Sequence, residues 1–263
     1  GYWPDGLYTA PSDEALIYDI QTMKNLGFNM IRKHVKVETA RWYYHCDRLG
    51  MIVWQDMVNG GTYNAPFMTW LPALFPKFKL HTSDRIHPLF GRKNVHGREE
   101  FIRECKETVT ALKAFPCIST WVIFNEGWGQ FDSKKLTALF RELDDTRLID
   151  SASGWFDRRQ GDFKSEHNYF AKQFVTPSDR AFVISEYGGY TCQIKGHTCS
   201  GKTYGYKICS SPEEFQAAYY KLMSEEIEPL KEQGLCGAVY TQLSDIEDEI
   251  NGLMTYDREV CKL

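Results

Sequence analysis

The sequence predicts an α/β fold in which parallel strands alternate with helices around a single core. Amphipathic helical stretches repeatedly end at glycine or proline and are followed by short strands. Those strands are apolar throughout rather than alternating, which is typical of a parallel sheet covered on both faces. We count seven of them, one short of a closed (β/α)8 barrel. Either the first strand lies upstream of this chain or the sheet is open and doubly wound.

The helices are predicted from their caps and their apolar faces. The first begins at Ser12, a capping residue followed by two acidic residues, and ends at Leu26-Gly27. The next presents Trp42, Cys46 and Leu49 on one face and ends at Gly50. Three more are expected around residues 101–112, 134–143 and 211–234. The seven strands are expected near residues 29, 51, 118, 148, 166, 181 and 237.

Composition narrows the class of protein. A chain of 263 residues with 43% hydrophobic and 25% charged residues fits one globular domain over residues 1–263. The net charge of −4 gives no sign of the basic surface that nucleic-acid binding needs, and no apolar run is long enough to span a membrane. Aromatic residues reach 14%, which favours either a large aromatic core or a cleft that stacks flat ligands such as sugar rings. The chain shows no apolar leader, so we expect a cytoplasmic location.

Candidate functional residues lie where the expected strands end, because the catalytic groups of such barrels lie at that edge. Two of them, Glu126 and Glu186, follow apolar strands directly. A glutamate placed there is desolvated on one side, which raises the pKa of its carboxyl group. Glycoside hydrolysis uses one carboxylic acid that faces one carboxylate. The alternative is that each glutamate caps a helix or pairs with a nearby arginine.

Four segments resemble motifs of glycoside hydrolase family 2, which includes β-galactosidases, β-glucuronidases and β-mannosidases. The segments 121–126 (WVIFNE) and 184–188 (ISEYG) resemble its two catalytic strand ends. The segments 26–34 (LGFNMIRKH) and 47–56 (DRLGMIVWQD) resemble two earlier strands. The resemblance covers nearly the whole chain in the right order, and it implies a single TIM-barrel catalytic domain whose first strand is missing or incomplete here.

The resemblance also implies roles for individual residues. Glu126 is expected to be the acid/base and Glu186 the nucleophile of a retaining exo-β-glycosidase. We expect their carboxyl groups to lie about 5–5.5 Å apart, and Trp121 and Trp128 to exclude water from Glu126. The residues expected to bind substrate are Arg32, His34, Asp56, Asn125, Trp128, Trp155, His167, Tyr169 and Gln242. Two of these residues also have purely structural interpretations. Arg32 could be a buried ion-pair partner, and His167 could be a core histidine whose hydrogen bonds are all made within the protein.

Departures from the family pattern bear on substrate and partners. The upstream sugar-binding and immunoglobulin-like sandwich domains are absent, so other domains of the parent chain are expected partners, beside a carbohydrate substrate. The Asn-x-Lys signature that recognises glucuronate is also absent, which favours a β-galactosidase-like enzyme. We expect no cofactor and no metal. The main alternative is a non-catalytic carbohydrate-binding barrel.

Two further motifs invite other interpretations. Residues 196–203 fit the phosphate-loop pattern G-x-x-x-x-G-K-T, but Tyr204-Gly205-Tyr206 follows where that loop needs a helix. We therefore expect an irregular loop there and no nucleotide binding. Cys192, His197, Cys199 and Cys209 could form a soft metal site or a disulfide, but the paired two-residue spacing of structural zinc sites is missing. Residues 1–11 are expected to form an extended loop over the barrel mouth, with Trp3 near the cleft.

Overall fold

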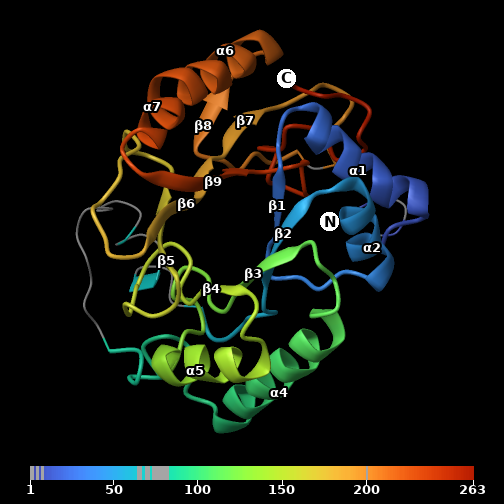
Figure 1. Ribbon diagram of the computed structural model, residues 1–263. Helices are drawn as coiled ribbons and strands as arrows, with labels where there is room; N and C mark the ends of the chain where they lie inside the picture. Colours follow the sequence, from blue (N-terminus) through green and yellow to red (C-terminus); the bar gives the residue numbers. More distant parts are fainter. Residues whose placement is uncertain are drawn as a thin grey trace.

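The seven predicted strands form a ring of parallel strands (Figure 1). The computed structural model describes residues 3, 6, 9–63, 67, 68, 72, 83–199 and 201–263. Within them one sheet has the strand order β1-β2-β3-β4 and a second has the order β5-β6-β9, every neighbouring pair being parallel. The strands of the ring are β1 (Met30–Lys33), β2 (Ile52–Asp56), β3 (Ile118–Val122), β4 (Leu148–Asp150), β5 (Phe163–Asn168), β6 (Ala181–Gly188) and β9 (Leu235–Thr241).

The helices lie outside the ring at the positions that the sequence predicts. Ser12 caps the first helix by accepting a hydrogen bond from the amide of Ala15 at 3.3 Å. Gly50 ends the second in the left-handed conformation, φ 67°, that a residue with a side chain rarely adopts. The helices are α1 (Asp13–Asn25), α2 (Ala40–Leu49), α4 (Val95–Leu112), α5 (Ser133–Leu143), α6 (Pro212–Leu222), the π-helical turn η2 (Met223–Ile227) and α7 (Glu228–Lys231).

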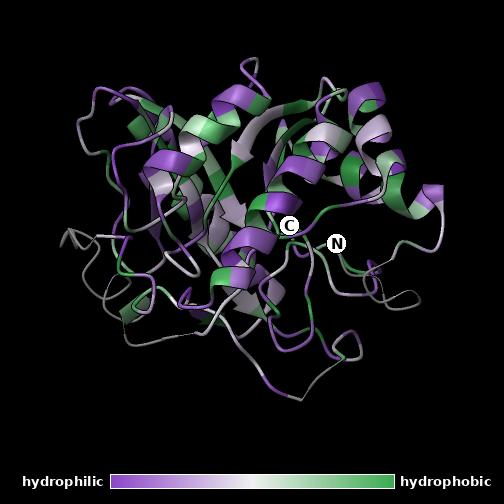
Figure 2. Cartoon of the chain, turned by 90° about the horizontal axis from the view of Figure 1, so that it is seen from below, coloured by the Kyte–Doolittle hydropathy of each residue, from purple (hydrophilic) through white to green (hydrophobic). Residues whose placement is uncertain are grey.

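Two hydrophobic layers hold the ring together. The larger layer fills the space between strands and helices and contains the buried faces of α1, α2, α4 and α6. The smaller one packs inside the ring and consists of Trp54, Val122, Phe163 and Val183. Figure 2 shows the matching pattern on the helices, whose ribbons are banded in hydrophilic and hydrophobic colours. Burial on both faces explains why the strands lack polar alternation.

The alternation of side chains along β3 corrects one expectation. Val122 points into the ring, whereas its neighbour Trp121 belongs to the outer layer. The indole N–H of Trp121 donates to Asp144, just beyond α5, at 3.0 Å. The prediction that Trp121 excludes water from Glu126 is therefore wrong, because its ring faces the helices and not the mouth of the ring.

The ring departs from a regular barrel in three places. No hydrogen-bonded ladder joins β4 to β5 or β9 to β1 among the described residues, so the ring consists of two sheets with seven strands together, the number that the sequence predicts. No helix separates β4 from β5 or β5 from β6. After β6 the chain forms a small ribbon of β7 (Tyr190–Cys192) and β8 (Lys207–Cys209). The described residues of 196–203 lie between these two strands as an irregular loop with no helix after Lys202, which confirms that prediction.

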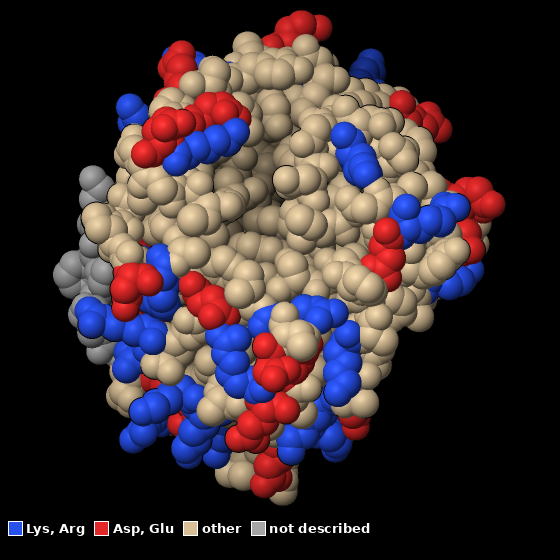
Figure 3. Space-filling view, viewed as in Figure 1, with Lys and Arg blue, Asp and Glu red and all other residues tan. Residues whose placement is uncertain are grey.

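The remaining features concern membrane spans, surface charge and the N-terminal residues. Among residues placed in the structure no helix is both long and apolar enough to cross a bilayer. Figure 3 shows that acidic and basic side chains are mixed on the face it presents, most densely over α4 and α5. Most of residues 1–11 lie outside the described residues, but Trp3 is buried, with Lys36 and Arg258 over its ring.

Candidate active site

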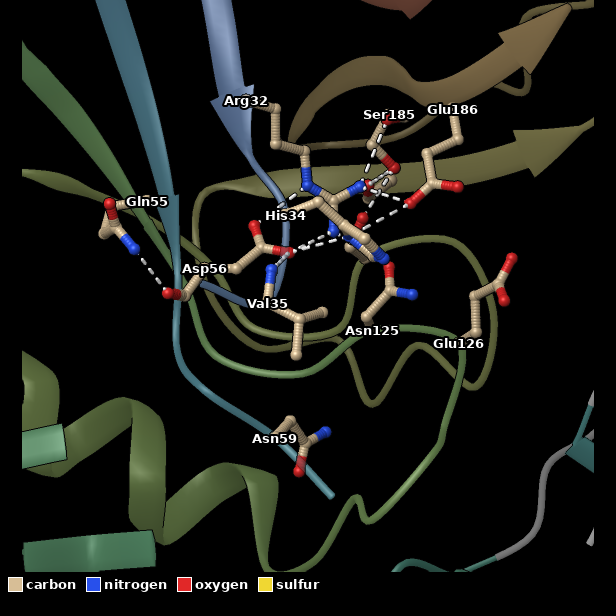
Figure 4. Close-up of polar contacts among 12 residues, drawn as sticks. Arg32, His34, Val35, Gln55, Asp56, Asn59, Asn125, Glu126, Ser185 and Glu186 are labelled. Carbon is tan, nitrogen blue, oxygen red and sulfur yellow. Dashed lines mark hydrogen bonds and ion pairs between the residues drawn. The ribbon is translucent and has the colours of Figure 1, made fainter. Parts of the chain in front are cut away.

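The two glutamates singled out by the sequence meet at one end of the ring. Glu126 follows β3 and Glu186 lies in β6, and Figure 4 shows both carboxyl groups facing the same space. The backbone of Glu126 has a φ of 52°, a conformation that non-glycine residues rarely adopt. Its amide donates to the carbonyl of Ser153 at 3.0 Å, beyond β4, which helps to hold this strained conformation. Such local strain is common at functional sites.

Arg32, at the end of β1, is the cationic centre of the site. Its side chain, only 3% exposed, donates to both carboxylate oxygens of Asp56, at 2.9 and 2.8 Å. It also donates to Glu186 Oε1 at 2.8 Å and to the carbonyl of Ser185 at 3.2 Å. A guanidinium group fits this geometry because its donors are fixed in one plane. Arg32 is thus a buried ion-pair partner and also a direct contact of Glu186, whereas its part in binding substrate stays a prediction.

Glu186 is held in its ionised form. Burial works to raise the pKa of its carboxyl group, but His167, Arg32 and His34 outweigh burial and hold this pKa well below its usual range. The hydroxyl of Tyr169, a residue directly after β5, also donates to Glu186 Oε2. The expectation that a strand-end position raises the pKa of the glutamate is therefore wrong for Glu186. The sequence reveals the desolvation, whereas the compensating charges come from His167 on the neighbouring strand β5 and from Arg32 and His34, which lie far away along the chain.

Glu126 has different surroundings. Its Oε1 lies 2.8 Å from Nδ1 of His167, a side chain that is completely buried in β5. The Nε2 of the same imidazole lies 3.6 Å from Glu186 Oε1. One oxygen of each glutamate and one nitrogen of His167 all lie within 4.8 Å of one another. One carboxylate is thus paired with a guanidinium group and the other contacts an imidazole, so the two are electrostatically different.

Asn125 and His34 are oriented by the same ion-pair network. The side-chain oxygen of Asn125 accepts from Arg32 at 2.8 Å, which turns its amide nitrogen toward the side of Glu126 (Figure 4). His34 Nδ1 lies 3.2 Å from Asp56, and 56% of the His34 side chain is exposed. Desolvation opposes a charge on His34, but the hydrogen bond to Asp56 and the charge of Glu186 raise its pKa. Both side chains therefore offer polar atoms to a ligand in the mouth.

The other predicted binding residues lie around this centre at different depths. Trp155 is buried, packs against the ring of His167 at 5.8 Å, and donates to its backbone carbonyl at 3.3 Å. Trp128 packs edge-on against Tyr63 at 5.8 Å and donates to Gly61 at 3.3 Å. Gln242, directly after β9, donates to the side chains of Glu249 and Asn251. Trp155 is thus placed to support His167 from behind.

Three residues of this region are missed by sequence reasoning. Ser153 contacts His167 Nε2 at 3.0 Å, and Asp150 at the end of β4 is buried with one carboxylate oxygen unpartnered. Burial raises the pKa of Asp150 to about 6. Glu249 accepts from Gln242 at 3.0 Å, and burial raises its pKa as well. Asp150 ends a predicted strand, so the rule that functional residues lie at strand ends could have found it. Glu249 lies in a loop, where no sequence pattern marks it as functional.

The groupings with metal-like spacing do not include the cysteines. Among the residues that the structure describes, these groupings are Glu126 with His167 and Glu186, and His197 with Asp257 and Glu259. The first already holds the positive charge of Arg32. In the second, His197 Nδ1 pairs with Asp257 at 2.8 Å. All eight cysteines are free thiols, so the possible set of Cys192, His197, Cys199 and Cys209 is not assembled.

Comparison with known proteins identifies the family to which the chain is similar. Residues 10–260 match the model described as glycosyl hydrolases family 2, TIM barrel domain. A β-galactosidase of Priestia megaterium is 24% identical over 213 residues, covering 73% of this chain and 17% of that protein. A β-galactosidase of Streptococcus thermophilus is 24% identical over 144 residues, covering 52% of this chain and 12% of that protein. The chain thus spans less than a fifth of the length of these relatives.

Solved structures share the fold over almost the whole chain. A β-galacturonidase from Eisenbergiella tayi bound to galacturonate has a TM-score of 0.66 at 16% identity, covering 96% of this chain and 46% of that one. An FMN-binding β-glucuronidase from Facaelibacterium prausnitzii L2-6 has a TM-score of 0.65 at 20% identity, covering 95% and 39%. Together with the family match, this confirms the predicted α/β barrel and excludes the open doubly wound sheet.

Proposed function

The chain belongs to glycosyl hydrolase family 2, and from this premise we propose that it is the catalytic barrel of a retaining exo-β-glycosidase. The observation that carries the proposal is the approach of Glu126 and Glu186: one carboxylate oxygen of each lies within 4.8 Å of the other, and the two carboxyl groups have different charged neighbours. Retaining enzymes hold their two carboxyl groups about 5–5.5 Å apart, whereas inverting enzymes leave roughly 6.5–9.5 Å for a water molecule. The short approach supports retention.

Glu186 is the nucleophile in this proposal. Arg32 and Tyr169 both donate to it, and its pKa lies below the usual range, so it is ionised at neutral pH. Its carboxylate attacks the anomeric carbon and forms a glycosyl ester, while the bond to the leaving oxygen breaks. Burial of Tyr169 keeps the pKa of its phenol well above the ordinary value, so this residue remains a hydrogen-bond donor.

Glu126 is the acid/base. In the first step it gives a proton to the leaving oxygen, and in the second it takes a proton from the water that cleaves the ester. Its carboxyl group contacts His167. Asn125, whose oxygen is engaged by Arg32, has its amide N–H groups left to donate to a sugar hydroxyl near the anomeric centre. His34, Asp56, Trp128, Trp155 and Gln242 are proposed to complete the sugar site.

The substrate we propose is a neutral, galactoside-like sugar. The curated relatives are named β-galactosidases, and the Asn-x-Lys signature linked to glucuronate is absent from the sequence. Glu249, paired with Gln242 beside β9, adds a carboxylate to this end of the ring and disfavours an anionic sugar by charge repulsion. The competing proposals are a carbohydrate-binding barrel without activity and a phosphate-loop protein, and the irregular conformation of the described residues within 196–203 opposes the second.

The experiment that tests this function is a panel of nitrophenyl β-glycosides assayed on the whole protein and on two variants. We expect the galactoside to be hydrolysed faster than the glucuronide and the mannoside. Glu186→Ala should abolish turnover, because no glycosyl ester can form. Glu126→Ala should lose about 10²–10⁴-fold with poor leaving groups, and much less in the first step with an activated nitrophenyl group. A whole protein that binds galactosides and cleaves none of the panel would be a carbohydrate-binding barrel instead.

A further inference from the structure

A pair of stacked tyrosines lies beside Glu186. Tyr169 follows β5 directly, and its hydroxyl donates to Glu186 Oε2. The ring of Tyr169 is stacked on the ring of Tyr206, with a centroid distance of 3.8 Å and an interplanar angle of 11°. The ring of His167 meets Tyr169 edge-on at 6.4 Å. Among the described residues, the face of Tyr206 is therefore the closest ring contact of Tyr169.

The small ribbon of β7 and β8 fixes the place of Tyr206. The amide of Tyr206 donates to the carbonyl of Gly189 at 3.1 Å, and the amide of Gly189 donates to the carbonyl of Thr241, at the end of β9, at 2.9 Å. The hydroxyl of Thr191, on β7, donates to the carbonyl of Tyr204 at 3.3 Å. These hydrogen bonds tie the segment before β8 to the barrel, so the backbone sets the position of Tyr206.

Gly189 leaves the space that this stack needs. Its φ is 65°, and a Cβ atom at this position would lie 2.4 Å from Cδ2 of Tyr206 and 3.6 Å from Cδ1 of Tyr169. A side chain at 189 would therefore displace the ring of Tyr206. On another side the two tyrosines border a cavity of about 440 Å³, which Phe170 and Tyr190 also line. Atoms that border a cavity lack packing partners there, so Tyr169 depends on Tyr206 for the close packing of its ring.

The carboxylate of Glu186 is held from both of its oxygens. Arg32 donates to Oε1 at 2.8 Å and Tyr169 donates to Oε2. The last torsion of a glutamate side chain has only broad preferences, so these donors set the plane of the carboxylate. We propose that Tyr206 is a positioning residue, whose ring holds the ring of Tyr169 in the orientation in which the hydroxyl reaches Glu186. This inference rests on the proposed function, in which Glu186 is the nucleophile, because a misaligned nucleophile attacks more slowly.

The direct test is the crystal structure of the Tyr206→Leu variant of the whole protein. Leucine keeps an apolar side chain but removes the flat face, so we expect the ring of Tyr169 to turn and its hydroxyl to leave Glu186. In Tyr206→Phe the stack is kept, and the hydrogen bond from Tyr169 to Glu186 should be kept as well. An unmoved Tyr169 in Tyr206→Leu would overturn the inference. This result needs no substrate, so a protein that cleaves no glycoside would defeat the proposed function while the role of Tyr206 is still decided.

A double-mutant cycle with Tyr169→Phe gives the kinetic test, on the nitrophenyl glycoside that the whole protein cleaves fastest. We expect Tyr206→Leu to lower kcat/KM roughly 3- to 10-fold, as for the loss of one hydrogen bond, and Tyr206→Phe to retain the wild-type value. In the Tyr169→Phe background the hydroxyl is already absent, so Tyr206→Leu should change kcat/KM less than about 2-fold. Equal losses in both backgrounds would mean that Tyr206 does not act through Tyr169, and would contradict the proposal.

Two more variants complete the test. In Ile208→Ala the altered side chain lies on β8 of the same ribbon but is exposed, so this control should keep the wild-type kcat/KM. Gly189→Ala displaces the ring of Tyr206 instead of removing it, and serves if Tyr206→Leu does not fold. Its loss should also nearly vanish in the Tyr169→Phe background. A loss in Ile208→Ala as large as that in Tyr206→Leu, or a loss in Gly189→Ala that persists without the Tyr169 hydroxyl, would count against the inference.

Discussion

The replacement Arg32→Met probes the charge balance beneath the site. Arg32 is 3% exposed and has Asp56, 2% exposed, and Glu186, 13% exposed, as ion-pair partners at 2.8 Å. Methionine fills a similar volume but leaves both carboxylates without their cation. Removal of one partner from a buried ion pair typically costs about 3–5 kcal/mol. Because a domain is stable by only about 5–15 kcal/mol, such a loss is a large share of the total.

The assay is urea unfolding of wild type and variant at several pH values. Arg32 is the main charge that lowers the pKa of Asp56, and together with His167 it holds the pKa of Glu186 below its ordinary range. A lowered pKa in the folded state contributes stability that is fully present above the unfolded values of about 4 and lost as the pH falls through the lowered ones. We expect the variant to be about 3–5 kcal/mol less stable at pH 7, with the difference shrinking below pH ~4.

An exposed arginine provides the control. Arg41 pairs with Asp13 at 2.6 Å, but its side chain is 60% exposed, so Arg41→Met should cost no more than about 1 kcal/mol. If Arg32→Met cost as little as Arg41→Met, or if its cost were the same at pH 3 and pH 7, the site would not depend on Arg32 for charge compensation. The reasoning on Glu186 as a permanently ionised nucleophile would then be refuted as well.

Three further predictions follow from other parts of the structure. Tyr169→Phe removes the hydroxyl that donates to Glu186, and we expect kcat to fall on the order of 10–10³-fold with little change in the unfolding midpoint; unchanged kcat would contradict this. The pKa of Asp150 is raised to about 6, so its stabilising effect is present below about pH 4 and lost as the pH rises through 6. Asp150→Asn should therefore unfold at higher urea than wild type at pH 7 but not at pH 4, and the reverse order would be evidence against burial as the cause. Millimolar ATP should leave Tm unchanged, since ~1 mM ligand at a micromolar Kd would add about 4 kcal/mol of stability.

The sequence predicts the fold well because its signals are local. The helix that begins at Ser12 and ends at Leu26 and the apolar strand at 118–122 each depend on caps and periodicity within one segment. The strand-end rule then places Arg32, Asn125, Glu126, His167 and Glu186 at one edge, and the structure brings these five side chains together. Parallel topology makes this possible, because all the strands end at the same face.

Electrostatics and side-chain direction are where sequence reasoning fails. The lowered pKa of Glu186 depends on His167 and on Arg32, which lies 154 positions away along the chain. Trp121 is close to Glu126 in the sequence, but the alternation along β3 turns its ring outward. Asp245, four residues beyond the end of β9, forms a buried ion pair with Lys262 at 2.7 Å. In each case the outcome is set by a partner that the sequence alone does not identify.

The central claim is double displacement through Glu186, and the configuration of the first-formed sugar tests it most directly. The measurement is ¹H NMR of the anomeric proton during early hydrolysis of nitrophenyl β-galactoside by the whole protein, before mutarotation mixes the anomers. The account predicts that β-galactose appears first and the α-anomer only later. If α-galactose appeared first, water would be displacing the leaving group directly, and the assignment of Glu186 as a covalent nucleophile would be contradicted.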